Sequence, residues 1–95
     1  MTTTTIPFTA RRSTYPMLRW VFQRGERTVT CELDLRGPHT FDVCLVPHWN
    51  VSGTVIESFG DAVTAMERHA EIARALRHAG WIVVEHASDL AQAAA

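Results

Sequence analysis

The chain has 95 residues, of which 46% are hydrophobic and 20% are charged, and its formal net charge is −1. This length fits one small domain, and the near-neutral charge argues against a dedicated nucleic-acid or membrane-surface binder. No apolar run approaches a membrane span, and the first residues lack the apolar core of a signal peptide, so we expect a cytoplasmic protein without a membrane partner.

The charge is unevenly spread along the chain. Residues 1–36 carry six Arg against three acids, a balance of +3, whereas residues 37–95 carry three Arg against seven acids, a balance of −4. A domain this small is often only marginally stable as a monomer, and association is a common remedy. We therefore expect a homodimer.

The two ends of the chain differ in pattern from the centre. Residues 1–16 are rich in Thr, contain Pro7 and Pro16 and show no sustained period, which predicts a flexible N-terminal arm. Whether apolar residues of this arm become ordered on a partner stays open. Residues 88–95 have helix propensity but little to bury, so they are expected to form a frayed tail around a single domain at 17–87.

The first strands form a predicted hairpin. Apolar residues alternate from Leu18 to Phe22 and again from Val29 to Leu35. A two-residue turn starting at Gly25, of type II′, would place Phe22 opposite Val29, so turn chemistry and apolar face select the same register.

The next predicted strand covers residues 40–47. A three-residue loop at 37–39 keeps its apolar side chains on the face of Leu33, which places Cys31 on the core face and Cys44 on the other. The two thiols should therefore share neither a disulfide nor a metal. The same register sets Asp34 opposite Asp42, a like-charge pair that costs stability unless a cation lies between them.

A short strand at 54–57 is expected to lead into one long helix over 58–81. Ser58 is the predicted N-cap, with Asp61 three residues later, and Gly80 and Trp81 are the predicted stop. The expected buried face recurs at intervals of three and four residues. Its members are Phe59, Ala62, Val63, Met66, Ala70, Ala73 and Leu76.

These elements predict an α+β fold. The expected architecture is a mostly antiparallel sheet of four or five strands, with one long helix packed across one face, in the order β-β-β-(β)-α-β. The last strand begins at Ile82 and is apolar on both sides, as expected of a strand paired within a sheet or against another chain.

The sequence holds no motif of catalysis or metal binding. Its five His match no ligand spacing such as HExxH, and nothing resembles GxSxG, a P-loop or GxGxxG. We expect no enzyme, no cofactor and no catalytic or metal-binding residue. An enzyme would instead require a pocket that joins Cys44 or a histidine to a polar partner.

Two interpretations of function remain. The first is a small non-enzymatic interaction module that self-associates through its sheet face or edge. Its candidate interaction surface lies on the sheet face opposite the helix and comprises Arg19, Val21, Cys44, Val46 and His48.

The alternative is an accessory nucleic-acid-binding domain that uses arginines of the N-terminal hairpin region. Its candidate contacts are Arg19, Arg24, Arg27 and Arg36. It is less favoured because the face without the helix carries Glu32, Asp34 and Asp42, which would repel phosphates.

Overall fold

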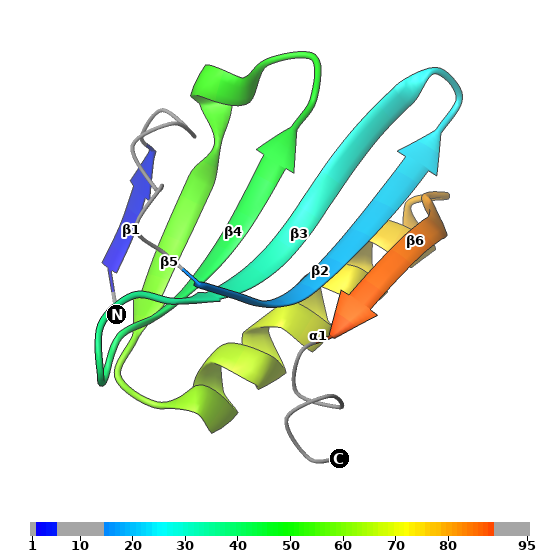
Figure 1. Ribbon diagram of the computed structural model, residues 1–95. Helices are drawn as coiled ribbons and strands as arrows, with labels where there is room; N and C mark the ends of the chain where they lie inside the picture. The colour runs from blue at the N-terminus through cyan, green and yellow to red at the C-terminus, as the bar shows by residue number, and fades with distance from the viewer. Residues whose placement is uncertain (1, 6–14, 89–95) are drawn as a thin grey trace.

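A computed structural model describes residues 2–5 and 15–88, with side chains from residue 17 onward. One α-helix, one short 3-10 helix and six strands make up this part of the chain (Figure 1). In chain order they are β1 (Thr2–Thr5), β2 (Tyr15–Arg24), β3 (Arg27–Leu35), β4 (Phe41–Pro47), η2 (Val51–Gly53), β5 (Val55–Phe59), α1 (Ala62–His78) and β6 (Ile82–Ser88).

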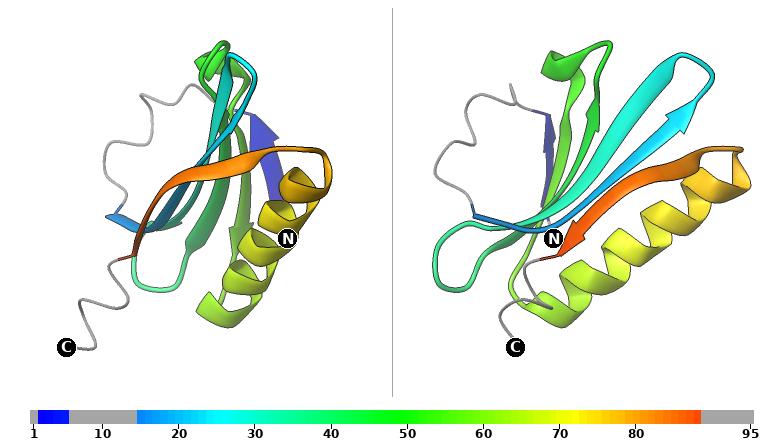
Figure 2. Two further views of the ribbon diagram at one scale, coloured as in Figure 1. Left: turned by 90° about the vertical axis from the view of Figure 1, so that its right-hand side faces the viewer. Right: turned by 45° about the vertical axis from the view of Figure 1, so that its right-hand side comes forward.

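The strands form one antiparallel sheet in the order β1-β5-β4-β3-β2-β6. Helix α1 makes a second layer on one side of this sheet and runs beside β6 (Figure 2). The predicted α+β class, the antiparallel sheet and the single helix across one face are thereby confirmed. The sheet has one strand more than expected, because Thr2–Thr5 pairs with β5 at the edge.

The predicted strand register is also confirmed. Phe22 lies opposite Val29 across the β2–β3 hairpin, and Gly25 in its two-residue turn has φ of 60°, as the primed turns require. Between β3 and β4, Asp34 lies opposite Asp42. A period of two and short turns leave little freedom in register, since a slip by one residue would expose the whole apolar face.

The predicted start of the helix at Ser58 is wrong. Strand β5 continues through Phe59, and Ser58 uses its hydroxyl to donate a hydrogen bond of 2.7 Å to Asp42 Oδ1. The N-cap is instead Asp61, whose carboxylate accepts the backbone N–H of Thr64 at 2.8 Å. The predicted end is confirmed: Gly80 has φ of 94°, and the N–H of Trp81 donates to the carbonyl of Leu76.

The predicted buried face of the helix is rotated from the observed one. Val63 and Met66 are 65% and 40% exposed, whereas Ala65, His69 and Ala73 are buried against the sheet. Small side chains at 65 and 73 let the helix backbone approach the strands closely. Of the expected face, Phe59, Ala73 and Leu76 do pack in or against the core, whereas Val63 and Met66 lie on a flank.

The core lies between α1 and the central strands. Phe22, Cys31 and Leu33 are each 0% exposed there, and Trp81 packs against this cluster. Two boundaries differ from expectation: β2 already begins at Tyr15, and β6 extends to Ser88. Most of the predicted arm and the tail from 89 lie outside the described residues. Within the described chain, no helix combines the length and apolarity that crossing a membrane requires.

Candidate functional site

The predicted interaction surface lies on the second face of the sheet, which is the face opposite α1. Three of its five members expose little surface: Val21, Cys44 and Val46 are 7%, 0% and 5% exposed. Arg19 and His48 remain accessible at its margin. The side chains that were expected to form an apolar contact patch are thus mostly withdrawn from solvent, and whether this surface binds a partner stays a prediction.

Arg19 and His48 both line a shallow hollow of about 270 Å³ on the second face. One nitrogen of His48, Nε2, lies 2.6 Å from the hydroxyl oxygen of Thr30. Because Thr30 is only 2% exposed, its hydroxyl is not presented to a substrate as a nucleophile would be. The other residues that line the hollow are Glu32, Val46 and Val51.

A buried acidic network explains how the sheet tolerates the pair Asp34 and Asp42. Arg36 Nε donates to Asp42 Oδ2 at 2.7 Å, and Ser58 donates to the other oxygen of the same carboxylate. The Asp42 carboxylate in turn raises the pKa of the Arg36 guanidinium through their hydrogen bond. The sulfur of Cys44 donates to Asp34 Oδ2 at 3.6 Å. A cation at this pair was expected from the sequence, and Arg36 supplies one at Asp42.

The four arginines of the nucleic-acid interpretation separate into two groups. Arg36 binds Asp42, and Arg19 forms a 2.9 Å ion pair with Glu85, so both of these charges are compensated by nearby carboxylates. Arg24 and Arg27 lie instead at the β2–β3 turn. The structure does not bring the four together into one basic surface.

The two cysteines and one of the histidines are buried in the folded protein, and the burial of the histidine was not predicted from the sequence. Cys31 and Cys44 are both buried, on opposite faces, and burial raises the pKa of the Cys31 thiol to about 12. His69, which the sequence did not place in the core, is 3% exposed and donates from Nε2 to the carbonyl of Cys31 at 3.1 Å. In the described part of the chain, no three His, Cys, Asp or Glu residues cluster as metal ligands would.

Strand β6 forms one edge of the sheet and was not singled out as a site from the sequence. Among the described elements it pairs only with β2. Ile82 and Val84 on it are 62% and 49% exposed. A bulge falls at this point, because Val21 pairs with Glu85 and Phe22 with Val83, which leaves Val84 outside the regular pairing.

The flank of α1 that faces β2 and β6 is apolar in its N-terminal half and basic in its C-terminal half, where Arg74, Arg77 and His78 lie. Ala70 and Arg77 line a cavity together with Trp20 of β2, which fixes the direction of this flank. Val63 and Met66 lie on the same flank at spacings of seven and four residues before Ala70. The signal was present in the sequence, as the apolar stripe that was expected to be buried.

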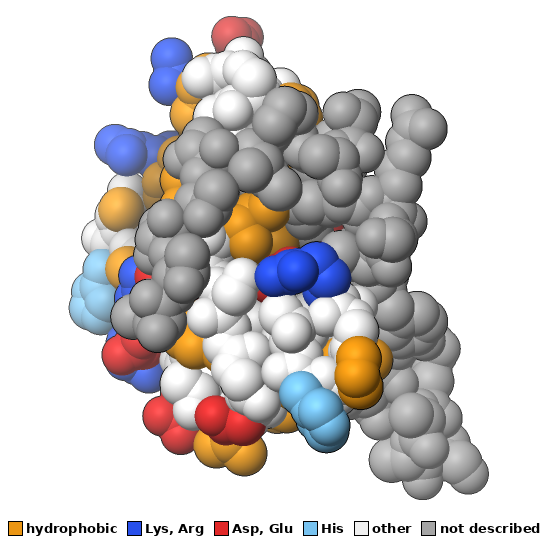
Figure 3. Space-filling model, turned by 90° about the vertical axis from the view of Figure 1, so that its left-hand side faces the viewer, with side chains coloured by type: hydrophobic (Ala, Val, Ile, Leu, Met, Phe, Trp, Pro, Cys, Tyr) orange, Lys and Arg blue, Asp and Glu red, His pale blue; other side chains and the backbone are white. Residues whose placement is uncertain are grey.

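The opposite side of the molecule has a different surface. Viewed from the side of β1, charged, polar and apolar side chains are mixed over the part of the surface that is visible (Figure 3). The outermost strand there consists of four threonines. Among the described helices and strands, the two most exposed large apolar side chains are Val63 of α1 and Ile82 of β6.

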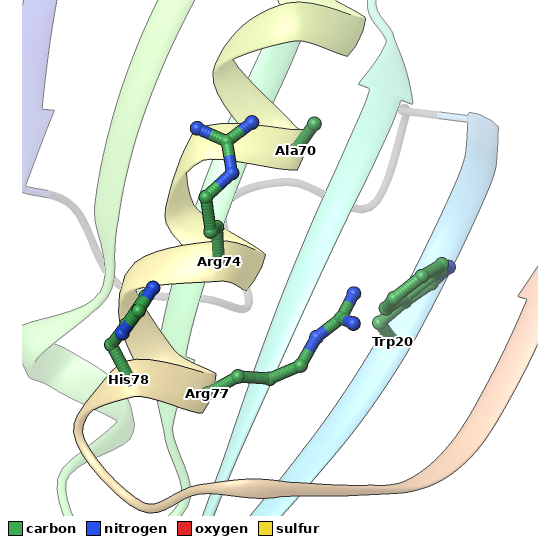
Figure 4. A pocket seen from close by; sticks show the side chains of 5 residues that line it. All are labelled: Trp20, Ala70, Arg74, Arg77 and His78. Atoms are coloured by element: carbon green, nitrogen blue, oxygen red, sulfur yellow. The ribbon is translucent and has the colours of Figure 1, made fainter.

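The cavity beside Trp20 has a volume of about 480 Å³. Arg77 extends from the last turn of α1 toward the indole, with its guanidinium carbon 5.6 Å from the ring centroid (Figure 4). Arg74 and His78 supply the other polar lining. Cations also suit the negative end of a helix, so their presence does not by itself define a ligand site.

Taken together, fold and surfaces define a two-layer α+β domain with an apolar edge and buried thiols. Comparison with protein-family models, with curated proteins and with solved structures found no match.

Proposed function

We propose that the chain is a small non-enzymatic interaction module that self-associates through the edge of β6 and the neighbouring flank of α1. The observation that carries this proposal is the exposure of Ile82 and Val84 on a strand that has one partner among the described elements. Unpaired backbone groups and apolar side chains on an edge strand favour pairing with another chain.

The flank of α1 supports the same partner. Val63, Met66 and Ala70 are exposed on the side of the helix that faces β2 and β6. If β6 pairs antiparallel with β6 of a second copy, a twofold axis passes between the two strands. The two helices then lie on the same side of the joined sheet, where these apolar flanks approach one another.

A second copy is favoured over an unrelated partner by the symmetry of this arrangement. An antiparallel strand pair is self-complementary, so the same residues meet on both sides of the axis. Strand β6 adds little opposing charge, because its one acidic residue, Glu85, is engaged by Arg19 of its own chain.

Light scattering after size exclusion tests the proposal at high micromolar concentration. The expected mass is twice that of the 10.6 kDa chain. Val84→Lys places a charge at the proposed interface and should shift the mass to that of one chain. Val55→Lys is the matched control, since Val55 is 37% exposed on β5, which is already paired on both sides.

A second variant separates edge pairing from the helix flank. Met66→Lys together with Val63→Lys should weaken the dimer without altering β6. A wild-type mass of one chain at high micromolar concentration would contradict the proposal. So would a dimer that survives Val84→Lys and dissociates with Val55→Lys.

A further inference from the structure

We propose that the end of the molecule at the β2–β3 turn binds single-stranded nucleic acid. We call this region the hairpin end and define it by Arg24, Arg27, Trp49 and Trp81. The β2–β3 turn and the β4–β5 connection lie at the same end of the sheet (Figure 1). The N–H of His48 donates to the carbonyl of Thr28 and ties these two connections together.

Aromatic rings at the hairpin end form a partly exposed stack. The rings of Trp49 and Trp81 are inclined by only 15°, with centroids 6.3 Å apart. The guanidinium carbon of Arg27 lies 4.5 Å from the centroid of the Trp49 ring. Trp49 is 48% exposed, which is unusual for so large an apolar side chain. Rings and guanidinium planes of this kind are the surfaces on which unpaired bases stack.

The two arginines of the hairpin end flank a turn that carries one carboxylate, Glu26, and neither of them forms an ion pair with it. Arg24 and Arg27 lie directly opposite each other across the turn, an arrangement of like charges that costs stability. No ion pair joins either guanidinium to an acidic side chain within residues 17–88. Two adjacent guanidinium groups without such partners give a local positive potential that attracts phosphates.

A second group of basic side chains lines the cavity beside Trp20. Arg74, Arg77 and His78 lie in the last turns of α1, directly before the turn that leads to Trp81. No carboxylate lines that cavity. Aromatic stacking next to a basic groove is the usual arrangement of surfaces that bind single strands without strict sequence preference.

This assignment differs from a binding surface on the sheet face. There, Arg19 and Arg36 already form ion pairs with Glu85 and Asp42, and buried acids surround them. A duplex keeps its bases stacked inside, so its phosphates could contact the arginines but its bases could not stack on the tryptophan rings. The geometry therefore points to a single strand.

Fluorescence anisotropy with a labelled oligo-deoxythymidine of about 15 nucleotides tests the inference on the full chain. Contacts of two phosphates with Arg24 and Arg27 predict that binding weakens about 25-fold between about 20 and about 200 mM salt. Arg24→Gln with Arg27→Gln should remove most of this salt dependence. Trp49→Leu should weaken binding roughly fivefold or more, whereas Trp49→Phe should retain most of it, because the ring is kept.

Arg19→Gln is the control for a lost arginine away from the hairpin end: it removes one positive charge, where the double variant removes two, and it lies on the second face. It should leave the affinity within about twofold of the wild type. Circular dichroism spectra establish that each variant is folded. The inference is overturned by lack of binding at about 20 mM salt, by affinity unchanged in both the double arginine variant and Trp49→Leu, or by equal binding of duplex. Equal binding of heparin, which has no bases, overturns it as well.

Discussion

His69 on α1 donates a hydrogen bond of 3.1 Å from Nε2 to the backbone carbonyl oxygen of Cys31 on β3. The imidazole is 3% exposed and meets the indole of Trp20 edge to face, with ring centroids 5.8 Å apart. The contact connects the buried side of the helix to the centre of the sheet. A titratable group thus lies in the buried row of the helix, one turn from Ala65 and one turn from Ala73.

This position predicts a loss of stability in mild acid. Burial lowers the pKa of His69 in the folded protein, whereas histidine in an unfolded chain titrates near 6.5. As the pH falls below that value, the unfolded state takes up a proton that the folded state does not. The free energy of unfolding should therefore decrease from about pH 7 to about pH 5.

His69→Leu removes this group and should flatten the decrease, measured by urea unfolding across that pH range. At neutral pH the variant should be less stable by about 1 kcal/mol, because the carbonyl of Cys31 loses its donor. His39→Gln, at an exposed turn, is the matched control and should keep the wild-type pH dependence. An equal pH dependence in wild type and His69→Leu would refute the prediction.

The N-terminus of α1 offers a direct comparison between the predicted and the observed cap. Asp61→Ala removes the acceptor of the Thr64 N–H and should lower the midpoint temperature of thermal unfolding. Asp61→Asn should unfold close to the wild-type midpoint, since Asn is also a good cap. Hydrogen bonds from Thr64 lower the pKa of Asp61 in the folded protein. The stabilisation that this carboxylate gives to the folded state is therefore present above the pKa of an unfolded aspartate, near 3.9, and is lost at lower pH.

Asp61→Asn should for this reason be less sensitive to strong acid than the wild type, as followed by circular dichroism during acid titration. If Asp61→Ala melts at the wild-type temperature, the carboxylate is not the effective cap.

The sequence specified the strands much more fully than the helix. The pairs Phe22–Val29 and Leu33–Val43 follow from alternation and turn length, because only one register keeps the apolar residues together. The helix has apolar residues around more than half of its circumference. Pattern alone therefore did not decide between burying Met66 and burying His69; the close approach of the sheet at Ala65 and Ala73 did.

The surfaces were less predictable for two physical reasons. A run of four threonines has no apolar alternation, so β1 was not apparent before its backbone was seen paired with β5. The stack of Arg27, Trp49 and Trp81 joins the start of β3 to two connections far from it in the chain. Local periodicity contains no information on such a contact.

The two thiols should be unreactive in the native protein. Cys31 has a pKa raised to about 12, mainly by burial, so its thiolate is scarce at pH 8. Cys44 is 0% exposed and shielded from reagents. Ellman's reagent should therefore label neither thiol until denaturant is added, after which both react.

Single variants Cys31→Ala and Cys44→Ala assign any signal to one residue. No disulfide should form in the native chain, because the two side chains point to opposite faces of the sheet. Rapid native labelling of the Cys44→Ala variant would mean that Cys31 is accessible, contrary to the packing described above.

The last prediction concerns the ion pair that holds Asp42 opposite Asp34. Arg36→Gln removes the cation that pairs with the buried Asp42 carboxylate and should reduce the free energy of unfolding by about 1–3 kcal/mol. Asp42→Asn removes one of the two acids, so in that background the loss of Arg36 should cost much less. The two substitutions should therefore not be additive in a double-mutant cycle.

Arg19→Gln provides the comparison for an exposed pair, since Arg19 and Glu85 have side chains that are 40% and 61% exposed. That substitution should change the free energy of unfolding by less than about 1 kcal/mol. The difference arises because the Asp42 side chain is only 2% exposed, so water cannot replace the guanidinium as a partner. Additive effects of Arg36→Gln and Asp42→Asn in urea unfolding would show that Arg36 does not compensate the acidic pair.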